Sequence, residues 1–326
     1  MAGEWAPDIL GDGFEQQTLA LGADDEGDLV ATVVRSIPNP LRGVLGPLHD
    51  VDVLSVHGWS DYFFQPAQAH FWTGLGARFF ALDLRKYGRS LRDGQTPGFI
   101  TDLDDYDADI AAALDAIGHR RGRRLVLLGH STGGLTLALW AARHHGEVAA
   151  LVLNSPWLEL QLGAMGRQAL APLVQARARW DPRGTQAAVD FGFYTRAQRE
   201  VGVLPVDGYR DTWRPEFGFP THPAWFAAVL EGHRRVAFGI EVGCPALVLL
   251  SARSSLQLTW TAAMSSSDSV LVVDDIARTA TRIGRSVTIA RIDGALHDVF
   301  LSRPDARDEA YSALERWVLR GALEGR

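Results

Sequence analysis

The sequence predicts an α/β fold in which a mostly parallel central sheet carries helices on both faces and is interrupted by an inserted helical lid. Three observations support this prediction. Short apolar runs alternate with segments of helical periodicity. A glycine-rich turn, residues 129–134, joins one such run to one such segment. Between residues 156 and 240 the strand rhythm stops, and prolines interrupt short helical pieces.

An antiparallel hairpin is expected first, because two extended runs, residues 14–21 and 29–37, flank a turn-rich segment. The apolar runs that follow have the length of buried strands, and they cover residues 51–56, 79–84, 125–128, 148–153, 246–250 and 287–292. Apolar residues recur at spacings of three and four in the segments expected to be helical, which are residues 103–117, 135–143, 276–283 and 307–319. This alternation favours parallel pairing, with ligands at the carboxyl ends of the strands.

Residues 156–240 are expected to form the lid, between a first core part, residues 1–155, and a second, residues 241–326. The lid stretch holds 12 of the 30 aromatic residues. Any single one is most simply explained as core of a small helical lobe, whereas their number favours a substrate pocket.

The composition argues against several classes of protein. A net charge of −7 disfavours a nucleic-acid-binding surface. No apolar run approaches the roughly 20 residues of a membrane-spanning helix. The first ten residues lack the basic and then apolar pattern of a secretory signal, so the cytoplasm is the expected compartment. The single cysteine, Cys244, cannot form an internal disulfide or a thiolate cluster, and no metal site is expected.

The strongest chemical signal is Gly129-His130-Ser131-Thr132-Gly133, placed between a predicted strand and a predicted helix. In that context a serine sits on a sharp turn that projects its hydroxyl above the sheet. Glycines flank it because larger side chains would collide with the neighbouring strand and helix. Ser131 is therefore the expected nucleophile; a glycine-rich turn that only packs a helix on a sheet is the alternative.

A serine hydroxyl needs a histidine base, and the histidine needs a carboxylate. His297 follows the last predicted strand, where a loop returns it towards Ser131. The acid should lie after residues 246–250, where Asp268, Asp274 and Asp275 are candidates. Asp268 is favoured because it lies in the loop itself, whereas the other two precede a helix and suit a cap.

The negative oxygen of a tetrahedral intermediate needs backbone N–H donors. The amide of Thr132, next to the nucleophile, and the amide of Trp59, in the loop after residues 51–56, are expected to supply them. The residues expected to contact substrate, or to orient the loops around it, are His57, Gly58, Tyr62, His130 and Trp157.

These motifs together resemble the α/β-hydrolase superfamily, and specifically its serine aminopeptidase-like, monoglyceride-lipase or lysophospholipase-like branch. The resemblance spans nearly the whole chain and rests on Val56-His57-Gly58-Trp59, the stretch from Ala81 to Ser90, the serine turn, Asp268-Ser269-Val270-Leu271 and Gly294-Ala295-Leu296-His297-Asp298. It implies a hydrolase without a cofactor that acts through an acyl-enzyme. The loop before Asp268 is longer than in the family pattern.

Three functions remain open at this stage. The first is hydrolysis of carboxylic esters with a hydrophobic acyl part, of the monoacylglycerol or lysophospholipid type. The second is cleavage of amide or peptide bonds, which requires an acidic anchor for a substrate amine; the lid offers Glu159, Glu216 and Glu231. The third is a binding protein that keeps the fold to hold a small ligand. The sequence gives no indication of oligomeric state.

Overall fold

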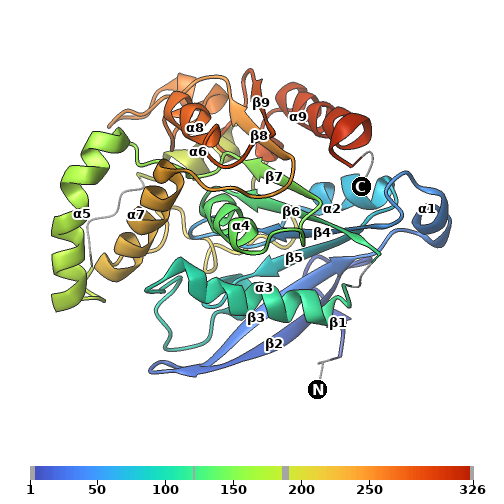
Figure 1. The fold of residues 1–326 in the computed structure, drawn as a ribbon, viewed down its shortest axis with the longest axis horizontal. Helices are drawn as coiled ribbons and strands as arrows, with labels where there is room; N and C mark the ends of the chain where they lie inside the picture. Colours follow the sequence, from blue (N-terminus) through green and yellow to red (C-terminus); the bar gives the residue numbers. More distant parts are fainter. Residues whose placement is uncertain (1–3, 120–121, 186–190, 324–326) are drawn as a thin grey trace.

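The computed structural model describes residues 4–119, 122–185 and 191–323. Within these residues, strands pair into one nine-stranded sheet of order β1-β2-β3-β5-β4-β6-β7-β8-β9 (Figure 1). The strands are β1 (Ala6–Pro7), β2 (Glu15–Asp24), β3 (Gly27–Ser36), β4 (Val51–Val56), β5 (Arg78–Asp83), β6 (Arg124–His130), β7 (Ala150–Asn154), β8 (Ala246–Ser251) and β9 (Val287–Ile292). The pairs from β5 to β9 along this order are parallel, and β1, β2 and β3 add an antiparallel edge. The predicted hairpin and parallel sheet are confirmed.

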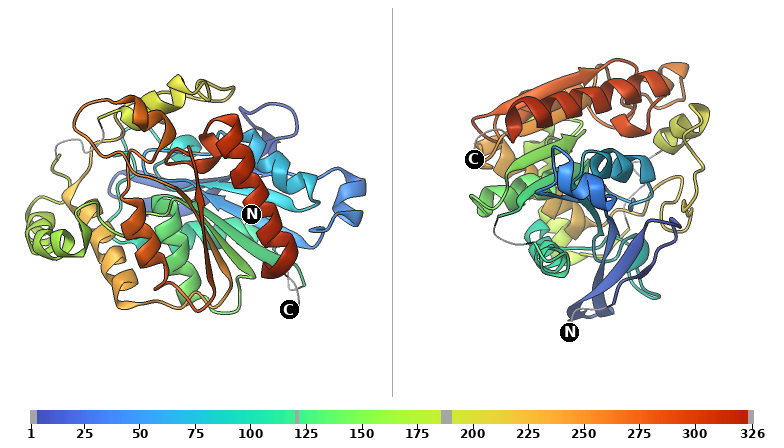
Figure 2. Two further views of the ribbon diagram at one scale, coloured as in Figure 1. Left: turned by 90° about the horizontal axis from the view of Figure 1, so that it is seen from above. Right: turned by 90° about the vertical axis from the view of Figure 1, so that its right-hand side faces the viewer.

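Helices cover both faces of the sheet (Figures 1 and 2). They are α1 (Pro40–Leu45), α2 (Pro66–Gly74), α3 (Asp107–Ala116), α4 (Thr132–Arg143), α5 (Gly163–Trp180), α6 (Phe193–Glu200), α7 (Pro223–Phe238), α8 (Val273–Ala280) and α9 (Pro304–Trp317). One apolar cluster packs α3, α4 and α8 on one face, and a second packs α2 and α9 on the other. Figure 2 shows α9, in red, lying across its face of the sheet.

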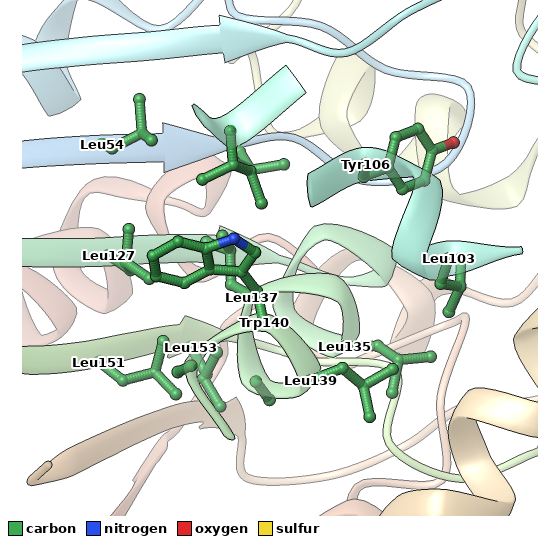
Figure 3. Packing of buried hydrophobic residues seen from close by; sticks show 14 of the residues in the cluster. Leu54, Leu103, Tyr106, Leu127, Leu135, Leu137, Leu139, Trp140, Leu151 and Leu153 are labelled. Carbon is green, nitrogen blue, oxygen red and sulfur yellow. The ribbon is translucent and has the colours of Figure 1, made fainter. Parts of the chain in front are cut away.

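The central strands are largely apolar because β4, β5, β6, β7 and β8 each contribute side chains to both clusters. In β6, Leu125 and Leu127 point into one cluster, whereas Val126 and Leu128 point into the other. Figure 3 shows Leu127 beside Trp140 of α4, which is 2% exposed. Full burial of one such leucine contributes about 1.5–3 kcal/mol, so the centre of the sheet is a stiff support for the loops at its carboxyl edge.

The stretch between β7 and β8 contains α5, α6 and α7. Helices α5 and α7 lie side by side at one end of the molecule (Figure 1). This is the stretch expected to form the lid; positions 186–190 of it lie outside the described residues, and its action as a lid stays a prediction. In the described part of the chain, no helix has the length and apolar character needed to span a bilayer.

Candidate active site

Ser131 lies in the turn between β6 and α4, at φ 50° and ψ −116°. A non-glycine residue rarely adopts this conformation, and the surrounding packing must hold it. A Cβ atom on Gly133 would lie 2.3 Å from the carbonyl oxygen of His57, and one on Gly129 would lie 2.7 Å from Cα of Gly134. Because these neighbours are backbone atoms, glycine is required at both positions for strand, turn and helix to meet.

His297 extends from the loop after β9 towards Ser131. Its Nε2 lies 3.0 Å from Oγ of Ser131, although the two residues are 166 positions apart. Both side chains are buried. A proton on Nδ1, which faces a carboxylate, would leave Nε2 able to accept the proton of the serine hydroxyl.

The carboxylate beside His297 belongs to Asp268. Its Oδ2 lies 2.9 Å from Nδ1 of His297. Its Oδ1 accepts hydrogen bonds from the backbone N–H groups of Val270 at 2.7 Å and Leu271 at 2.8 Å. The side chain is fully buried. These bonds fix the orientation of the carboxylate and therefore of the imidazole ring.

The other two candidate acids lie elsewhere. Helix α8 begins at Val273, three residues before the predicted start, so that Asp274 and Asp275 occupy its first turn. Asp274 pairs with Arg291 at 2.7 Å, and Asp275 pairs with Arg278 at 2.7 Å. Of the three aspartates proposed from sequence, the structure brings Asp268 to His297.

Two segments next to the serine carry the predicted oxyanion donors. Thr132 is the first residue of α4 and follows Ser131 directly, so its N–H lies at the positive end of the helix dipole. Gly58, which precedes Trp59, approaches so closely that a Cβ on it would lie 3.0 Å from Cβ of Ser131. Among the described residues, no backbone acceptor takes up the N–H of Thr132 or of Trp59. Neither N–H is thus committed to a backbone bond, and the role of both as oxyanion donors stays a prediction.

Two of the expected substrate contacts have their polar groups engaged inside the protein. The Nδ1 of His57 lies 2.7 Å from the carbonyl oxygen of Gly58, and its Nε2 accepts the N–H of Leu84 at 3.1 Å. Burial lowers the pKa of His57. Tyr62 is 1% exposed, and its hydroxyl donates to the carbonyl of Gly208 at 2.8 Å. In this structure both side chains hold loops, which is the orienting role expected of His57, and a contact of either residue with substrate stays a prediction.

His130 and Trp157 lie closer to the reacting groups. The ring of His130 lies 4.9 Å from that of His297, and burial lowers the pKa of His130. His130 also lines a small cavity of about 20 Å³, which has room for one water molecule. The backbone N–H of Trp157 donates to the carbonyl oxygen of Ser131 at 2.9 Å.

The aromatic residues of the lid stretch differ in burial. Trp225 and Phe219 are buried, and both pack against Trp59, with ring centres 3.7 Å and 6.1 Å apart. Trp180 and Phe238 are 94% and 80% exposed, so neither contributes to a core. The packing of Trp225 and Phe219 against Trp59 joins the lid stretch to the loop after β4.

Sequence reasoning missed Tyr194, which lies on α6. Its ring meets that of His297 edge to face, at 5.3 Å and 82°. Its hydroxyl oxygen is buried and has no hydrogen-bond partner among the residues that the structure describes. Burial raises the pKa of Tyr194 well above its usual range, so the phenol stays protonated and can donate to a ligand beside His297. No local motif distinguishes this residue from the other lid aromatics.

In the described ranges, no group of three or more histidine, cysteine, aspartate or glutamate side chains could hold a metal ion. The parallel sheet, the serine turn after β6 and the histidine loop after β9 define the α/β-hydrolase class. A family model described as serine aminopeptidase, S33, matches residues 49–303, and the chain belongs to this family.

Solved structures of similar fold include two lipases. A monoacylglycerol lipase from Paleococcus ferrophilus aligns with a TM-score of 0.64 and 17% identity, over 89% of this chain and 98% of that one. A soluble variant of monoglyceride lipase from Saccharomyces cerevisiae aligns with a TM-score of 0.64 and 14% identity, over 95% of this chain and 97% of that one. At such identities the likeness shows the fold.

A curated relative is more similar over a shorter stretch. A non-heme haloperoxidase from Rhodococcus erythropolis is 41% identical over 101 residues, which are 30% of this chain. The match spans about a third of the relative's length, 34%.

Proposed function

We propose that this protein is a serine hydrolase that cleaves carboxylic esters through an acyl-enzyme intermediate. The observation that carries the proposal is the hydrogen-bonded series Asp268, His297, Ser131, with distances of 2.9 Å and 3.0 Å. The buried, strained turn at Ser131 and the two amides beside it support the same conclusion.

In this mechanism His297 takes the proton of the Ser131 hydroxyl as Oγ attacks the ester carbonyl. The amides of Thr132 and Trp59 stabilise the negative oxygen. The imidazolium then gives its proton to the leaving alcohol, and the acyl-enzyme remains. A water molecule, deprotonated by His297, then attacks the carbonyl of the acyl-enzyme and releases the carboxylic acid and free Ser131. Asp268 holds the ring of His297 in place and stabilises the imidazolium.

We assign the substrate to esters of hydrophobic acyl chains with small polar alcohols, of the monoacylglycerol or lysophospholipid type. The names of the two lipases support this class, as does the aromatic cluster around Trp59. The buried hydroxyl of Tyr194 suits a hydroxyl of the alcohol part.

The alternative, amide cleavage at a free amine, needs an unpaired carboxylate as anchor. The three glutamates considered from the sequence are each neutralised by an arginine, in the pairs Glu159 with Arg167, Glu216 with Arg199 and Glu231 with Arg234. We therefore prefer ester hydrolysis to amide cleavage as the proposed activity.

Mass spectrometry of the intact protein after treatment with a fluorophosphonate tests the nucleophile without a known substrate. We expect one adduct on the wild type and none on Ser131→Ala. A chain-length series of p-nitrophenyl esters, with matched amino-acid p-nitroanilides, then separates ester from amide cleavage. A wild-type protein that takes up no label would favour the ligand-binding alternative and contradict the proposal.

A further inference from the structure

Asn154 ends β7 and is completely buried. Its backbone carbonyl accepts the N–H of Ser131 at 3.0 Å. Its side-chain Nδ2 donates to Oδ1 of Asp298 at 2.7 Å, and its Oδ1 accepts the N–H of Val299 at 3.1 Å. One residue therefore bonds to the turn that carries the nucleophile and to the loop that carries His297.

Asp298, which follows His297, is the residue of the histidine loop to which the Asn154 side chain donates. It is completely buried and also accepts hydrogen bonds from Nε2 of Gln65 at 2.7 Å and the N–H of Phe300 at 2.9 Å. Among the ion pairs of the described residues, none includes Asp298. The side-chain oxygens of Asp298 are thus held by neutral hydrogen-bond donors, and loss of one donor leaves a buried oxygen poorly satisfied.

We propose that Asn154 is a positioning residue that sets the approach of His297 to Ser131. The proposal rests on the function proposed above. Strand β7 lies between β6 and β8 inside the sheet, so Asn154 stands on a rigid element. It holds the serine turn through its carbonyl and the histidine loop through its carboxamide.

The physical reason is that proton transfer requires a short distance, here 3.0 Å between Oγ and Nε2. The two atoms belong to separate loops, and a displacement of 1 Å in such a pair lowers the rate by up to about 100-fold. A polar residue that is fully buried at the end of the apolar strand β7 destabilises the fold unless all its groups are bonded. Asn154 meets this condition through partners in the active-site loops.

Asn154→Ala removes the carboxamide but keeps the backbone carbonyl that accepts the N–H of Ser131. The variant therefore breaks only the hydrogen bonds to the loop that carries His297. With a p-nitrophenyl ester we expect kcat to fall about 10- to 100-fold and KM to stay within about twofold. The rate of fluorophosphonate labelling should fall with kcat. Asp52→Asn is the matched control, because Asp52 is completely buried and hydrogen-bonded to Arg78 at the opposite end of the sheet; its kcat should be that of the wild type. A kcat of Asn154→Ala within about twofold of the wild type would overturn the proposal.

Asn154→Asp keeps the shape of the side chain and places two carboxylates at the present 2.7 Å contact. Such a pair is stable when it shares one proton. We expect this variant to lose activity on the alkaline side, where the shared proton leaves, whereas the wild type keeps its activity there. A pH profile of the same shape as that of the wild type would count against the positioning role. Failure of both variants to fold would also count against it, because Asn154 would then contribute to stability alone. If the wild type itself takes up no label, the proposed function fails, and this inference fails with it.

Discussion

Asp61 and Arg214 form an ion pair at 3.0 Å in which their side chains are 6% and 3% exposed. Asp61 follows the loop that carries Trp59, and Arg214 belongs to the lid stretch. Arg214 also donates to Oε1 of Gln198 at 2.8 Å and lies 5.1 Å from the ring centre of Tyr194. The pair therefore joins the proposed oxyanion loop, the lid stretch and the residue that packs on His297.

Arg214→Met should destabilise the protein by about 3–5 kcal/mol, because it leaves the buried carboxylate of Asp61 without its cation. Burial already raises the pKa of Asp61 against the opposing effect of Arg214. Urea unfolding measures the change. Arg234→Met, at an exposed pair with Glu231, is the control and should change stability by about 1 kcal/mol or less. Equal small effects of both substitutions would contradict this assignment.

Asp268→Asn should lower kcat by about 10⁴-fold, because the amide favours the wrong tautomer of His297 and cannot stabilise its cation. Asp274→Asn should leave kcat within about twofold of the wild type, since Asp274 contacts Arg291 on the surface. Steady-state kinetics on one ester compares the two variants. A larger loss in Asp274→Asn would reverse the choice of acid.

Gly133→Ala should destabilise the protein by about 3 kcal/mol or abolish folding, because the new methyl group would lie 2.3 Å from a backbone carbonyl oxygen. The carbonyl belongs to the loop after β4 and cannot move without the sheet. Gly321→Ala, where no heavy atom of residues 4–119, 122–185 or 191–323 lies within 4 Å of the added Cβ, is the control. Thermal unfolding of the two variants checks this expectation, which equal melting temperatures would refute.

His233 should make stability depend on pH. Burial lowers its pKa to about 3, whereas an unfolded histidine takes up a proton below about pH 6.5. Between these values the unfolded state binds more protons, so the free energy of unfolding falls as pH falls, by about 1.4 kcal/mol per pH unit. His233→Gln can still donate to the carbonyl of Trp157 but does not titrate. Urea unfolding between pH 4.5 and 6.5 should give a flatter curve for this variant; parallel curves would contradict the prediction.

The bounds of strands with a continuous apolar run agree with the prediction, whereas helices without a clear apolar stripe were misplaced or missed. The predicted strands over residues 51–56 and 287–292 have the same bounds as β4 and β9. Helix α4 begins at Thr132, three residues earlier than predicted, because glycines in its first turn carry no apolar periodicity. Helix α2 was missed for a similar reason: its apolar residues form no clear stripe, although it buries Trp72 completely.

The sequence by itself predicted Ser131, His297 and Asp268 as the catalytic residues, because Ser131 and His297 lie in short motifs just after recognisable strands and Asp268 lies in the loop expected to hold the acid. Only the tertiary structure identified Asn154, Tyr194 and Arg214. Asn154 and Asp298 are 144 positions apart, and their hydrogen bond leaves no local pattern in either segment. Periodicity and turn chemistry report on neighbours in the chain, whereas the contacts that position the site join loops that meet only when the sheet has formed.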